Sequence, residues 1–469
     1  MRKKAAILVI IAMIFTMLSG FSAPSSANEA VTFKPGDKVQ FGSYLGEKLT
    51  WTVIDIGKDG DPLLFADSLI GSKAYDVPDY GNEKSYTWSY GSEREVFRMA
   101  NSFEWGVCTI RDWLNSAEDD AQNIKYTKGV SAYNKGYGNF MGYYEGESGF
   151  LSPKNFSPSE SDLIKSVKNK SYLIQYYKDL KEGGTHYVEF PELKWDIYEV
   201  SKGYENAYFR EVSDKVFLLN TYEYIKAYET VGEDIVNSDL IKPAQELLQN
   251  NSNFTGKIKT YVLRDTCMYG DELVPQNILV NAKYGEEGYG KATIVGYFTG
   301  AWPTPQNIEF KHFGVRPACW IDASKIKSLG GLGITTYPYI LNGTPAQTIR
   351  GAVNMSINGH EVKFIASSGA PFIDKASRTQ VPLRVAMESY GATVSWNNGS
   401  KTAIVEKNGI KVEVPVGKNY IVVNGQNQTI DTSAQIVNGK TYLPIKPVIE
   451  ALGGKVSWDQ ATKTVIISK

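Results

Sequence analysis

The sequence predicts an α+β protein in two folded parts: a strand-rich first domain and a C-terminal domain built from a duplicated unit of β-hairpins and one short helix. Three observations support this fold class. Runs of β-branched and aromatic residues, separated by Gly, Asp and Asn turns, recur along the chain. The stretches with helical spacing of apolar residues are short. One 25-residue pattern occurs twice near the C-terminus, at 381–405 and 443–467.

The first 27 residues predict a cleaved export signal. Arg2, Lys3 and Lys4 form a basic start, residues 5–18 are almost entirely apolar, and the small residues at 25–27 offer a cleavage site. A membrane anchor is the alternative, but an apolar run of about 14 residues is shorter than the roughly 20 that span a bilayer. We therefore expect a secreted or cell-surface protein of Gram-positive type that does not span the membrane after cleavage.

Charge is spread unevenly along the chain. Residues 351–469 hold 13 Lys and Arg against 8 Asp and Glu. No part is basic enough, or rich enough in interleaved aromatics, to indicate nucleic acid binding. The basic surplus of the C-terminal part suits adhesion to an anionic cell wall, while an ordinary solvated surface is the simpler interpretation.

The first domain, residues 31–325, opens with a meander. The stretch "GDKVQFGSYLGEKLTWTVIDIGKDGDPLLFADSLI" alternates strand-like runs with Gly, Asp and Lys turns, which predicts about three strands. Arg111, Trp113 and Leu114 then open a helical stretch whose apolar side is expected to dock on the sheet.

The rest of the first domain adds a strand, a helix and two closing strands. A strand is predicted at 216–219, followed by a helix capped near Asn220 or Thr221. Two further strands are predicted at 259–265 and 313–322.

These pieces, in this order, resemble a family of secreted bacterial domains, the domain of unknown function 6273. The motifs that carry the resemblance are Gly36-Asp37, Phe41-Gly42-Ser43-Tyr44, Trp51, Cys108 with Arg111 and Trp113-Leu114-Asn115, Val216 to Leu219, Val262-Leu263-Arg264, and Gly314 to Ala318. The chain departs from the family pattern by large insertions within 121–211. The closing motifs are also similar to those of the formylglycine-generating-enzyme superfamily, whose fold is related to C-type lectins. The resemblance implies a compact lectin-like domain with a twisted antiparallel sheet, and fold analogy transfers no function.

Four residues inside these motifs are expected to be structural. They are Arg111, Trp113, Arg264 and Arg316. Arginines in signature strands of this kind usually tie loops to carboxylates inside the fold, and we expect the same of these three arginines.

The three cysteines, Cys108, Cys267 and Cys319, argue against a disulfide framework because their number is odd and small. Resemblance to formylglycine-type oxidases would require a copper-holding cysteine pair, for which Cys267 and Cys319 are the candidates. Their spacing does not match a catalytic pair. A structural disulfide or two separate buried thiols explain them better, and the sequence leaves both open.

Two aromatic loops are the candidate ligand-binding surface of the first domain. The segment "YNKGYGNFMGYYEGESGF" carries Tyr137, Tyr143 and Tyr144, and "GYFTGAWPTPQN" carries Phe298 and Trp302. Exposed aromatic rings stack on the apolar faces of sugars, while polar neighbours bind the hydroxyl groups. The alternative is that these long loops fold their rings inward as small cores.

Residues 326–351 are predicted to be a linker. The stretch "SLGGLGITTYPYILNGTPAQTIRGA" mixes Gly, Pro and Thr with little periodicity, which is typical of a semi-flexible connector. Part of "ITTYPYIL" is expected to add a strand to one neighbour.

The duplicated unit of the C-terminal domain reads "VPLRVAMESYGATVSWNNGSKTAIV" and, 62 residues later, "LPIKPVIEALGGKVSWDQATKTVII". In the second copy Ile445, Val448, Ile449 and Leu452 lie on one face of a short helix, and Gly453 follows where a left-handed residue ends it. A strand, a polar turn and a second strand come next, and an Asn-Gly hairpin lies upstream of each copy. Since neither helix is stable alone, the two units should pack face to face.

The repeated positions are expected to serve packing and chain reversal. Those conserved between the copies are mostly apolar, glycine or turn-forming, and Glu388 and Glu450 are placed on the solvent side of their helices. Trp396 and Trp458 are ligand platforms in one interpretation. The favoured interpretation is that each packs on its helix as a core residue.

Residues 352–469 resemble the copper amine oxidase-like N-terminal domain, or stalk domain, of secreted Gram-positive proteins. In those proteins the stalk acts as a spacer or attachment module, and copper belongs to a separate catalytic domain. A copper site needs clustered imidazoles, whereas His186, His312 and His360 are scattered along this chain. We expect no metal, no cofactor and no amine oxidation.

These observations predict an exported, non-catalytic surface protein. It would bind or display cell-wall glycan, or another extracellular ligand, through a lectin-like domain carried on a stalk. No GxSxG, HExxH or P-loop motif is present, and no catalytic residue is assigned. The alternative is an extracellular enzyme, either a carboxylate-based glycan hydrolase or a formylglycine-type cysteine oxidase.

Overall fold

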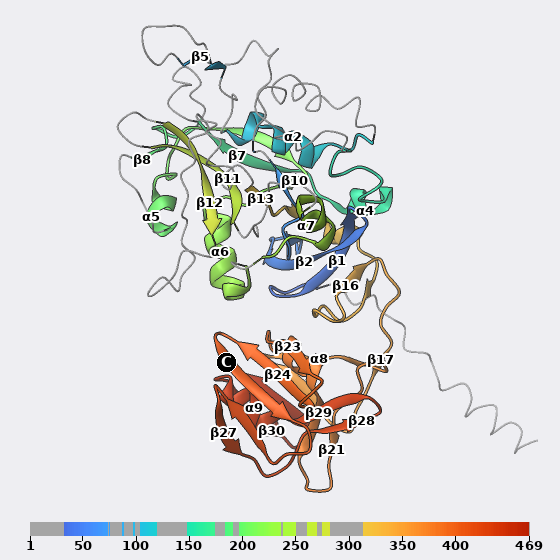
Figure 1. The fold of residues 1–469 in the computed structure, drawn as a ribbon. Coiled ribbons are helices and arrows are strands. Elements are labelled where there is room, and N and C mark those ends of the chain that lie inside the picture. Colours follow the sequence, from blue (N-terminus) through green and yellow to red (C-terminus); the bar gives the residue numbers. More distant parts are fainter. Residues whose placement is uncertain are drawn as a thin grey trace, which may run out of the picture. The chain divides into compact units, whose positions relative to one another are not determined.

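The computed structural model of the chain describes residues 32–73, 75, 87–88, 97–98, 104–119, 148–173, 183–190, 197–235, 238–249, 260–269, 274–281 and 313–468 (Figure 1). Strands dominate these ranges, and the helices between them are short. The chain is therefore a β-rich α+β protein. None of the helices in the described ranges combines the length and the apolar character that crossing a bilayer requires.

A seven-stranded sheet forms the centre of the first domain. Its order is β10-β14-β3-β2-β1-β16-β15. The strands are β1 (Lys38–Tyr44), β2 (Glu47–Ile56), β3 (Pro62–Ala66), β10 (Val216–Phe217), β14 (Ala318–Trp320), β15 (Leu329–Gly330) and β16 (Tyr339–Leu341). The predicted meander is confirmed, because β1, β2 and β3 pair antiparallel in sequence order. Leu45 and Gly46 close the first hairpin with φ of 51° and 79°, as its two-residue turn requires.

A second sheet is ordered β12-β11-β13-β4, with β8 also paired to β11. Its strands are β4 (Gly71–Lys73), β8 (Glu189–Phe190), β11 (Thr260–Tyr269), β12 (Val274–Asn281) and β13 (Phe313–Val315). The predicted strand at 313–322 divides here into β13 and β14, which belong to different sheets. Arg316 and Pro317 occupy the crossing, and proline has no N–H to continue a ladder.

Short helices and small strand pairs complete the first domain. The helices are α2 (Thr109–Asn115), α4 (Pro158–Leu163), α5 (Ile197–Lys202), α6 (Thr221–Val231), α7 (Lys242–Gln249) and the 3₁₀ turns η1 (Trp105–Val107), η4 (Gly232–Ile235) and η6 (Ala323–Lys325). The strand pairs are β5 (Thr87–Trp88) with β6 (Phe97–Arg98) and β7 (Val167–Tyr172) with β9 (Phe209–Asp214). The predicted helices are confirmed as α2 and α6. Asn220 caps α6 by accepting a hydrogen bond from the Glu223 N–H, 2.7 Å away.

An aromatic cluster fills the core between β1, α2 and the 148–156 segment. The rings of Phe41 and Phe156 lie 5.4 Å apart, and those of Trp113 and Phe150 lie 5.5 Å apart. Gly42, with φ of 68°, lies under this cluster, where an added Cβ would come 2.2 Å from the Phe156 ring. Only glycine fits there, which explains the Phe-Gly-Ser-Tyr motif.

The C-terminal domain consists of several small sheets around one apolar core. Their orders are β19-β18-β31-β30, β21-β22-β29-β28, β23-β24-β25-β26-β27 and β17-β20. The elements are β17 (Thr348–Ile349), β18 (Asn354–Ile357), β19 (His360–Glu361), β20 (Phe364–Ile365), β21 (Phe372–Ile373), β22 (Thr379–Pro382), α8 (Leu383–Ser389), β23 (Thr393–Asn397), β24 (Thr402–Lys407), β25 (Ile410–Pro415), β26 (Tyr420–Val423), β27 (Gln426–Thr429), β28 (Gln435–Val437), β29 (Lys440–Pro444), α9 (Ile445–Ala451), β30 (Lys455–Asp459) and β31 (Thr464–Ser468). The predicted hairpins, helices and strands of both copies are confirmed.

The two copies pack against each other, as predicted. Strand β22 of the first copy pairs with β29 of the second, with Val381 opposite Leu443. Side chains from both copies form one core cluster. The copies differ in how their last strands continue: β24 pairs with the next strand, β25, whereas β31 pairs in parallel with β18 from the start of the domain. The last strand of the chain thereby joins the first four-stranded sheet of the domain.

The segment predicted as a linker contains strands in the described structure. The strand expected within "ITTYPYIL" is β16, which pairs in parallel with β1 through Val39 and Tyr339. Ile334, upstream of it, belongs to the apolar core of the C-terminal domain. Thr336 donates from its N–H and its hydroxyl to the Glu388 carboxylate, at 2.9 and 2.7 Å.

Candidate functional site

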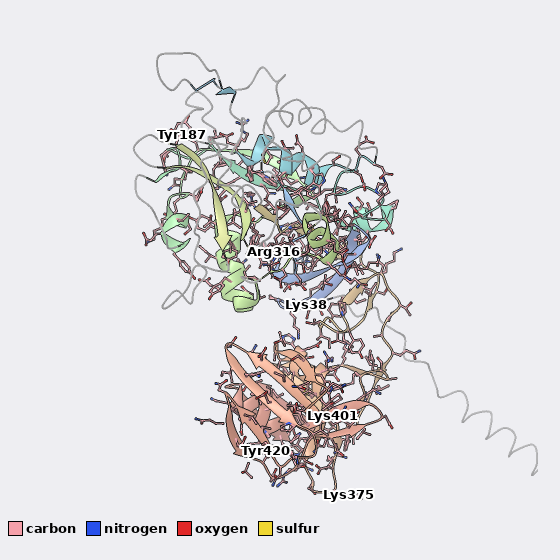
Figure 2. The ribbon with its side chains drawn as sticks, in the orientation of Figure 1. Lys38, Tyr187, Arg316, Lys375, Lys401 and Tyr420 are labelled. Carbon is pink, nitrogen blue, oxygen red and sulfur yellow. The ribbon has the colours of Figure 1, made fainter. Side chains whose placement is uncertain are left out.

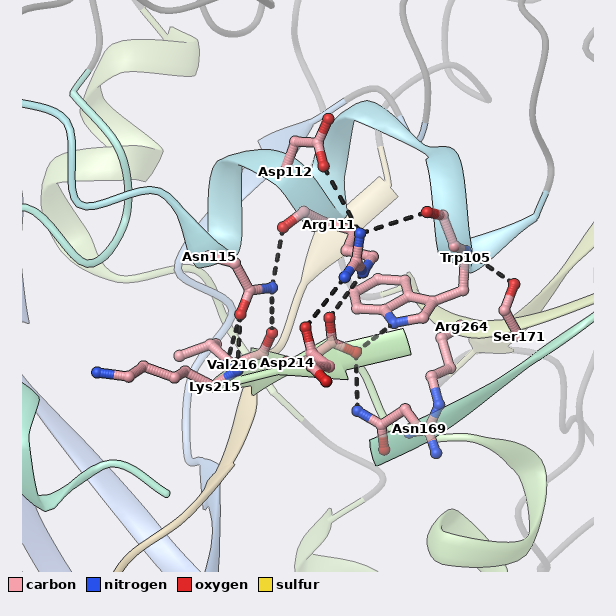
Figure 3. A network of polar contacts seen from close by, with 12 residues as sticks. Trp105, Arg111, Asp112, Asn115, Asn169, Ser171, Asp214, Lys215, Val216 and Arg264 are labelled. Carbon is pink, nitrogen blue, oxygen red and sulfur yellow. Dashed lines mark hydrogen bonds and ion pairs between the residues drawn. The ribbon is translucent and has the colours of Figure 1, made fainter. Parts of the chain in front are cut away.

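A buried carboxylate, Asp214, organises the polar centre of the first domain (Figure 3). It lies at the end of β9 and its side chain is fully buried. It accepts hydrogen bonds from Trp105 Nε1 at 2.8 Å, Arg111 Nε at 2.6 Å and Asn169 Nδ2 at 2.9 Å. These donors come from η1, α2 and β7, so the carboxylate joins four elements. Three donors, one of them cationic, satisfy a buried carboxylate.

Asn115, the last residue of α2, joins the helix to strand β10. Its Nδ2 donates to the carbonyls of Arg111 and Val216, at 3.0 and 2.8 Å. Its Oδ1 accepts from the N–H groups of Lys215 and Val216, at 2.7 and 3.1 Å. The side-chain amide both donates to and accepts from the backbone at the start of β10, as a neighbouring strand would. This explains the asparagine at the end of the Trp-Leu-Asn motif.

Arg264 lies next to this network (Figure 3) and holds the first turn of α6. It is buried and donates from Nη1 to the Leu218 carbonyl at 2.6 Å, and from Nη2 to Glu223 Oε1 at 2.8 Å. The neighbouring Asp265 accepts a hydrogen bond from the Thr221 N–H at 2.7 Å. The register of β11 shifts between Val262 and Thr266. This bulge turns two consecutive side chains toward the same helix terminus.

Asp265 is the most unusual acid of the network. Its side chain is buried, and within the described ranges Oδ1 has no hydrogen-bond partner. Burial raises the pKa of Asp265 to about 6. The carboxyl therefore changes protonation close to neutral pH.

Arg316 stabilises the crossing between the two sheets in a different way. The guanidinium lies 4.2 Å from the centre of the Phe65 ring and 5.4 Å from that of Tyr261. It donates to the carbonyls of Ala66, at 2.6 Å, and Ile235. The expectation that the signature arginines bind carboxylates is confirmed for Arg111 and Arg264, whereas Arg316 binds carbonyl groups instead among the residues that the structure describes. Figure 2 shows Arg316 among the elements of the first domain.

Trp113 is a core residue in the structure, as the sequence suggested. It is fully buried, and its Nε1 donates to the Ser148 carbonyl at 3.2 Å. The loop residues Tyr137, Tyr143, Tyr144, Phe298 and Trp302 lie outside the described residues. Phe150, at the end of the first aromatic loop, is fully buried in the aromatic cluster. At that one position the ring folds inward.

Cys319 is a buried free thiol in β14. The Cys267–Cys319 disulfide that the sequence left open is therefore not formed. Burial raises the pKa of the Cys319 thiol well above its usual range, so the reactive thiolate is disfavoured. Cys108 is also buried, and its Sγ donates to the Trp105 carbonyl at 3.3 Å. Within the described ranges, no three His, Cys, Asp or Glu side chains are grouped to hold a metal ion.

Two expectations for the C-terminal domain are wrong. Trp396 and Trp458 are 36% and 41% exposed and do not form part of the core. Glu388 is not on the solvent side: its side chain is only 4% exposed because Thr336 covers it, whereas that of Glu450 is 49% exposed. The repeat pattern reveals which residues correspond, but contacts made by segments outside the repeat decide their environments.

Sequence reasoning missed the acidic partners of the network. Asp214, Glu223 and Asp265 are as important to it as the arginines that the motifs pointed to. Asp265 directly follows the Val-Leu-Arg motif, and Asp214 lies two residues before strand 216–217; these placements were the available signals. The distances in sequence between the partners, from 41 to 103 residues for the two arginine pairs, hide the pairing.

Comparison with known proteins assigns both parts of the chain. The family described as Copper amine oxidase N-terminal domain matches residues 356–467. A protein named "Protease inhibitor" from Brevibacillus choshinensis is 30% identical over 115 residues, which cover 24% of this chain. That alignment spans only 34% of the relative, about a third of its length. The family described as Domain of unknown function (DUF6273) matches residues 60–323, more than half of the chain. The chain belongs to the DUF6273 family and carries a C-terminal domain of the copper amine oxidase N-terminal type.

Proposed function

We propose that the chain is an exported, non-catalytic protein of the bacterial surface that binds cell-wall glycan or a similar extracellular ligand. In this proposal a lectin-like first domain presents its aromatic loops, and the C-terminal domain is the stalk that carries it. The export signal predicted at residues 1–27 and the match of residues 356–467 to a stalk-type family support this placement.

One observation carries the non-catalytic part of the proposal. Both arginines of the polar centre are paired with carboxylates: Arg111 with Asp214, and Arg264 with Glu223. Buried pairs of this kind cost desolvation energy and bring conformational definition rather than reactivity. Cys319, the described member of the candidate oxidase pair, is buried as a thiol. The centre is thus suited to hold a fold that presents loops.

The proposal is tested with the full mature chain, residues 28–469. We expect it to sediment with purified peptidoglycan sacculi and to bind ligands on a glycan array. A variant with Trp302→Ala, Tyr143→Ala and Tyr144→Ala should fold as the wild type does and lose array binding. Absence of binding by the wild type to both sacculi and array would overturn the proposal.

One observation favours the alternative of an extracellular enzyme. Asp265 has an unpartnered oxygen within the described ranges and a pKa raised to about 6, which suits a proton donor or acceptor at neutral pH. Incubation of the chain with sacculi, followed by analysis of released fragments, tests this. We expect no release. Release that disappears in Asp265→Asn would establish the enzyme instead.

A further inference from the structure

The two repeated tryptophans, Trp396 and Trp458, are partly exposed rather than covered by the helices that were expected to pack on them. Trp396 lies opposite the buried Ala403, and Trp458 lies opposite the buried Val465, so each ring starts on the core face of its sheet. Each helix has seven residues, about 10 Å, and each strand has five, about 17 Å. Each strand is therefore longer than the helix that precedes it, and each tryptophan is the fourth of the five strand residues. Both rings are left 36% and 41% exposed.

A lysine accompanies each tryptophan in the turn that follows it. Lys401 and Lys463 are exposed, and each has φ of 49°. This left-handed conformation is costly for a residue with an ordinary side chain. Four other turns of the same domain place asparagine there, at 358, 408, 424 and 438, since asparagine tolerates it best. The two lysines are therefore poor choices for the turn itself.

The backbone at these two positions has a structural role that does not involve the lysine side chain. The Lys401 carbonyl accepts from the Val416 N–H at 3.1 Å, and the Lys463 carbonyl accepts from the Asn354 N–H at 2.9 Å. Asparagine would support both bonds. The presence of lysine in both copies therefore suggests that the exposed ammonium group binds something outside the domain.

We propose that each copy of the repeat forms a binding site for an acidic polysaccharide, built by Trp396 with Lys401 in the first copy and Trp458 with Lys463 in the second. This inference rests on the proposed function and names the chemistry of the ligand. The indole face stacks on a pyranose ring, and the ammonium group pairs with a carboxylate or phosphate on the same chain. The stalk would thereby hold the wall as well as carry the first domain.

The surroundings of the two sites favour an acidic glycan over a neutral one. The C-terminal domain has 13 Lys and Arg against 8 Asp and Glu between residues 351 and 469, which raises the local concentration of anionic chains. Two equivalent sites on one domain bind a repeating polymer more tightly than either does alone. A polysaccharide, which repeats its own unit, is the ligand that such a duplicated site suits.

The two sites differ in the hydrogen bonds that their own side chains make. Trp458 Nε1 donates to Gln460 Oε1 at 2.7 Å, which holds the ring in one orientation. In the first copy, Asn398 stands at the position of Gln460 and accepts from Lys401 Nζ at 2.8 Å. Lys463 has no such contact among the described residues. In the second site the Trp458 ring is held in place and the Lys463 ammonium group is available, so this site should bind the polysaccharide more tightly than the first.

The first experiment measures binding of the full mature chain to polygalacturonate, with dextran as the neutral polymer. We expect binding to polygalacturonate and little to dextran. Trp396→Ala should weaken binding about tenfold and Trp458→Ala by more than that, and the double variant should lose about a hundredfold or more, because the contributions of linked sites multiply. The matched controls are Ile373→Ala and Ile436→Ala, which remove equally exposed apolar side chains elsewhere on the domain. Equal loss in the controls, or no loss in the double variant, overturns the inference.

The second experiment separates binding from folding. The variant with Lys401→Asn and Lys463→Asn should unfold at the same temperature as the wild type or a higher one, because asparagine suits the left-handed turns. Its binding to polygalacturonate should fall, and the remaining binding should lose most of its dependence on salt. Unchanged affinity and salt dependence would refute the ammonium groups as ligands.

The two proposals fail in different ways. If the wild-type chain does not sediment with sacculi, the proposed function fails. If it sediments and the tryptophan and lysine variants sediment equally well, the surface protein remains and the two stalk sites are rejected. If the wild type prefers dextran to polygalacturonate, the acidic class of ligand is wrong.

Discussion

The two domains of this chain differ in the kinds of side chain that they bury. The interior of the first domain contains Glu104, Asp214, Arg264, Asp265 and Arg316, all less than 4% exposed. The buried side chains of the C-terminal domain are almost all apolar, with Ser368, Gln380, Thr402 and the Glu388 carboxylate as the polar exceptions. Buried ion pairs join distant segments of the first domain in addition to its apolar core. In the C-terminal domain, packing of apolar side chains from the two copies joins the segments.

Two buried acids of the first domain and two surface acids of the C-terminal domain respond to pH in opposite directions. Burial raises the pKa of Asp37 to about 7 and that of Asp265 to about 6. At these two positions the folded chain holds protons that the unfolded chain releases near pH 4, and the stability that they contribute is lost as pH rises from about 4 to 7. In the C-terminal domain, hydrogen bonds from Arg378 and Thr462 lower the pKa values of Asp431 and Asp459. Their contribution is lost as pH falls below about 4.

The largest effect is expected from breaking the central ion pair of the first domain. Asp214→Ala leaves Arg111, Trp105 and Asn169 without their acceptor and should cost about 3–5 kcal/mol of unfolding free energy. The control in the other domain is Asp431→Ala, which breaks an exposed pair with Arg378 and should leave the unfolding free energy nearly unchanged. Denaturant unfolding of the full chain measures both. Similar losses of unfolding free energy in the two variants would show that the buried ion pair of the first domain matters no more than the exposed pair of the C-terminal domain.

The largest loss of stability in the C-terminal domain is expected from a substitution that leaves a cavity in its core. Leu443→Ala removes a fully buried side chain where the copies pair, opposite Val381, and should cost about 2–5 kcal/mol. Because one core serves both copies, hydrogen exchange should quicken in 381–405 and 443–467 together. Ile436→Ala, at a 49% exposed position, should change stability by less than about 0.5 kcal/mol. Faster exchange confined to the second copy would show that the copies fold independently.

The contribution of Asp37 to the pH response can be removed by one substitution. Asp37 is buried, with its carboxylate accepting a hydrogen bond from the Lys34 N–H at 2.9 Å. Asp37→Asn keeps an acceptor and removes the charge that forms above pH 7. The variant should unfold at a higher temperature than the wild type at pH 8 and at nearly the same temperature at pH 4. An equal shift at both pH values would mean that the carboxyl does not titrate as its burial implies.

The smallest effect is expected between the two copies. Glu388→Ala removes the acceptor of two Thr336 hydrogen bonds and should cost about 1 kcal/mol, with faster exchange at 334–337. Glu450→Ala, the equivalent change in the second copy, breaks only a long exposed pair with Lys446 at 3.9 Å and should be nearly neutral. Equal costs would show that the Thr336 contact adds nothing.

Prediction from sequence was most successful where structure is local. The meander, the capped helix at Thr221 and the hairpins at Asn-Gly follow from residue types within a few positions of one another. The function of the aromatic loops stays a prediction, because Trp302 and its partners lie outside the described residues. The burial of Trp396 and Trp458 was predicted wrongly, since it depends on how far a helix reaches along a strand.

The sequence alone determined the division into domains of different character, the families and the correspondence between the two copies, because these depend on order, spacing and residue type. Only the tertiary structure decided that Asp214 and Glu223 are the partners of Arg111 and Arg264, that Cys319 stays a free thiol, and that the repeated tryptophans face solvent. The physical reason is that pairing and exposure depend on which distant segments meet, and spacing along a chain does not record that.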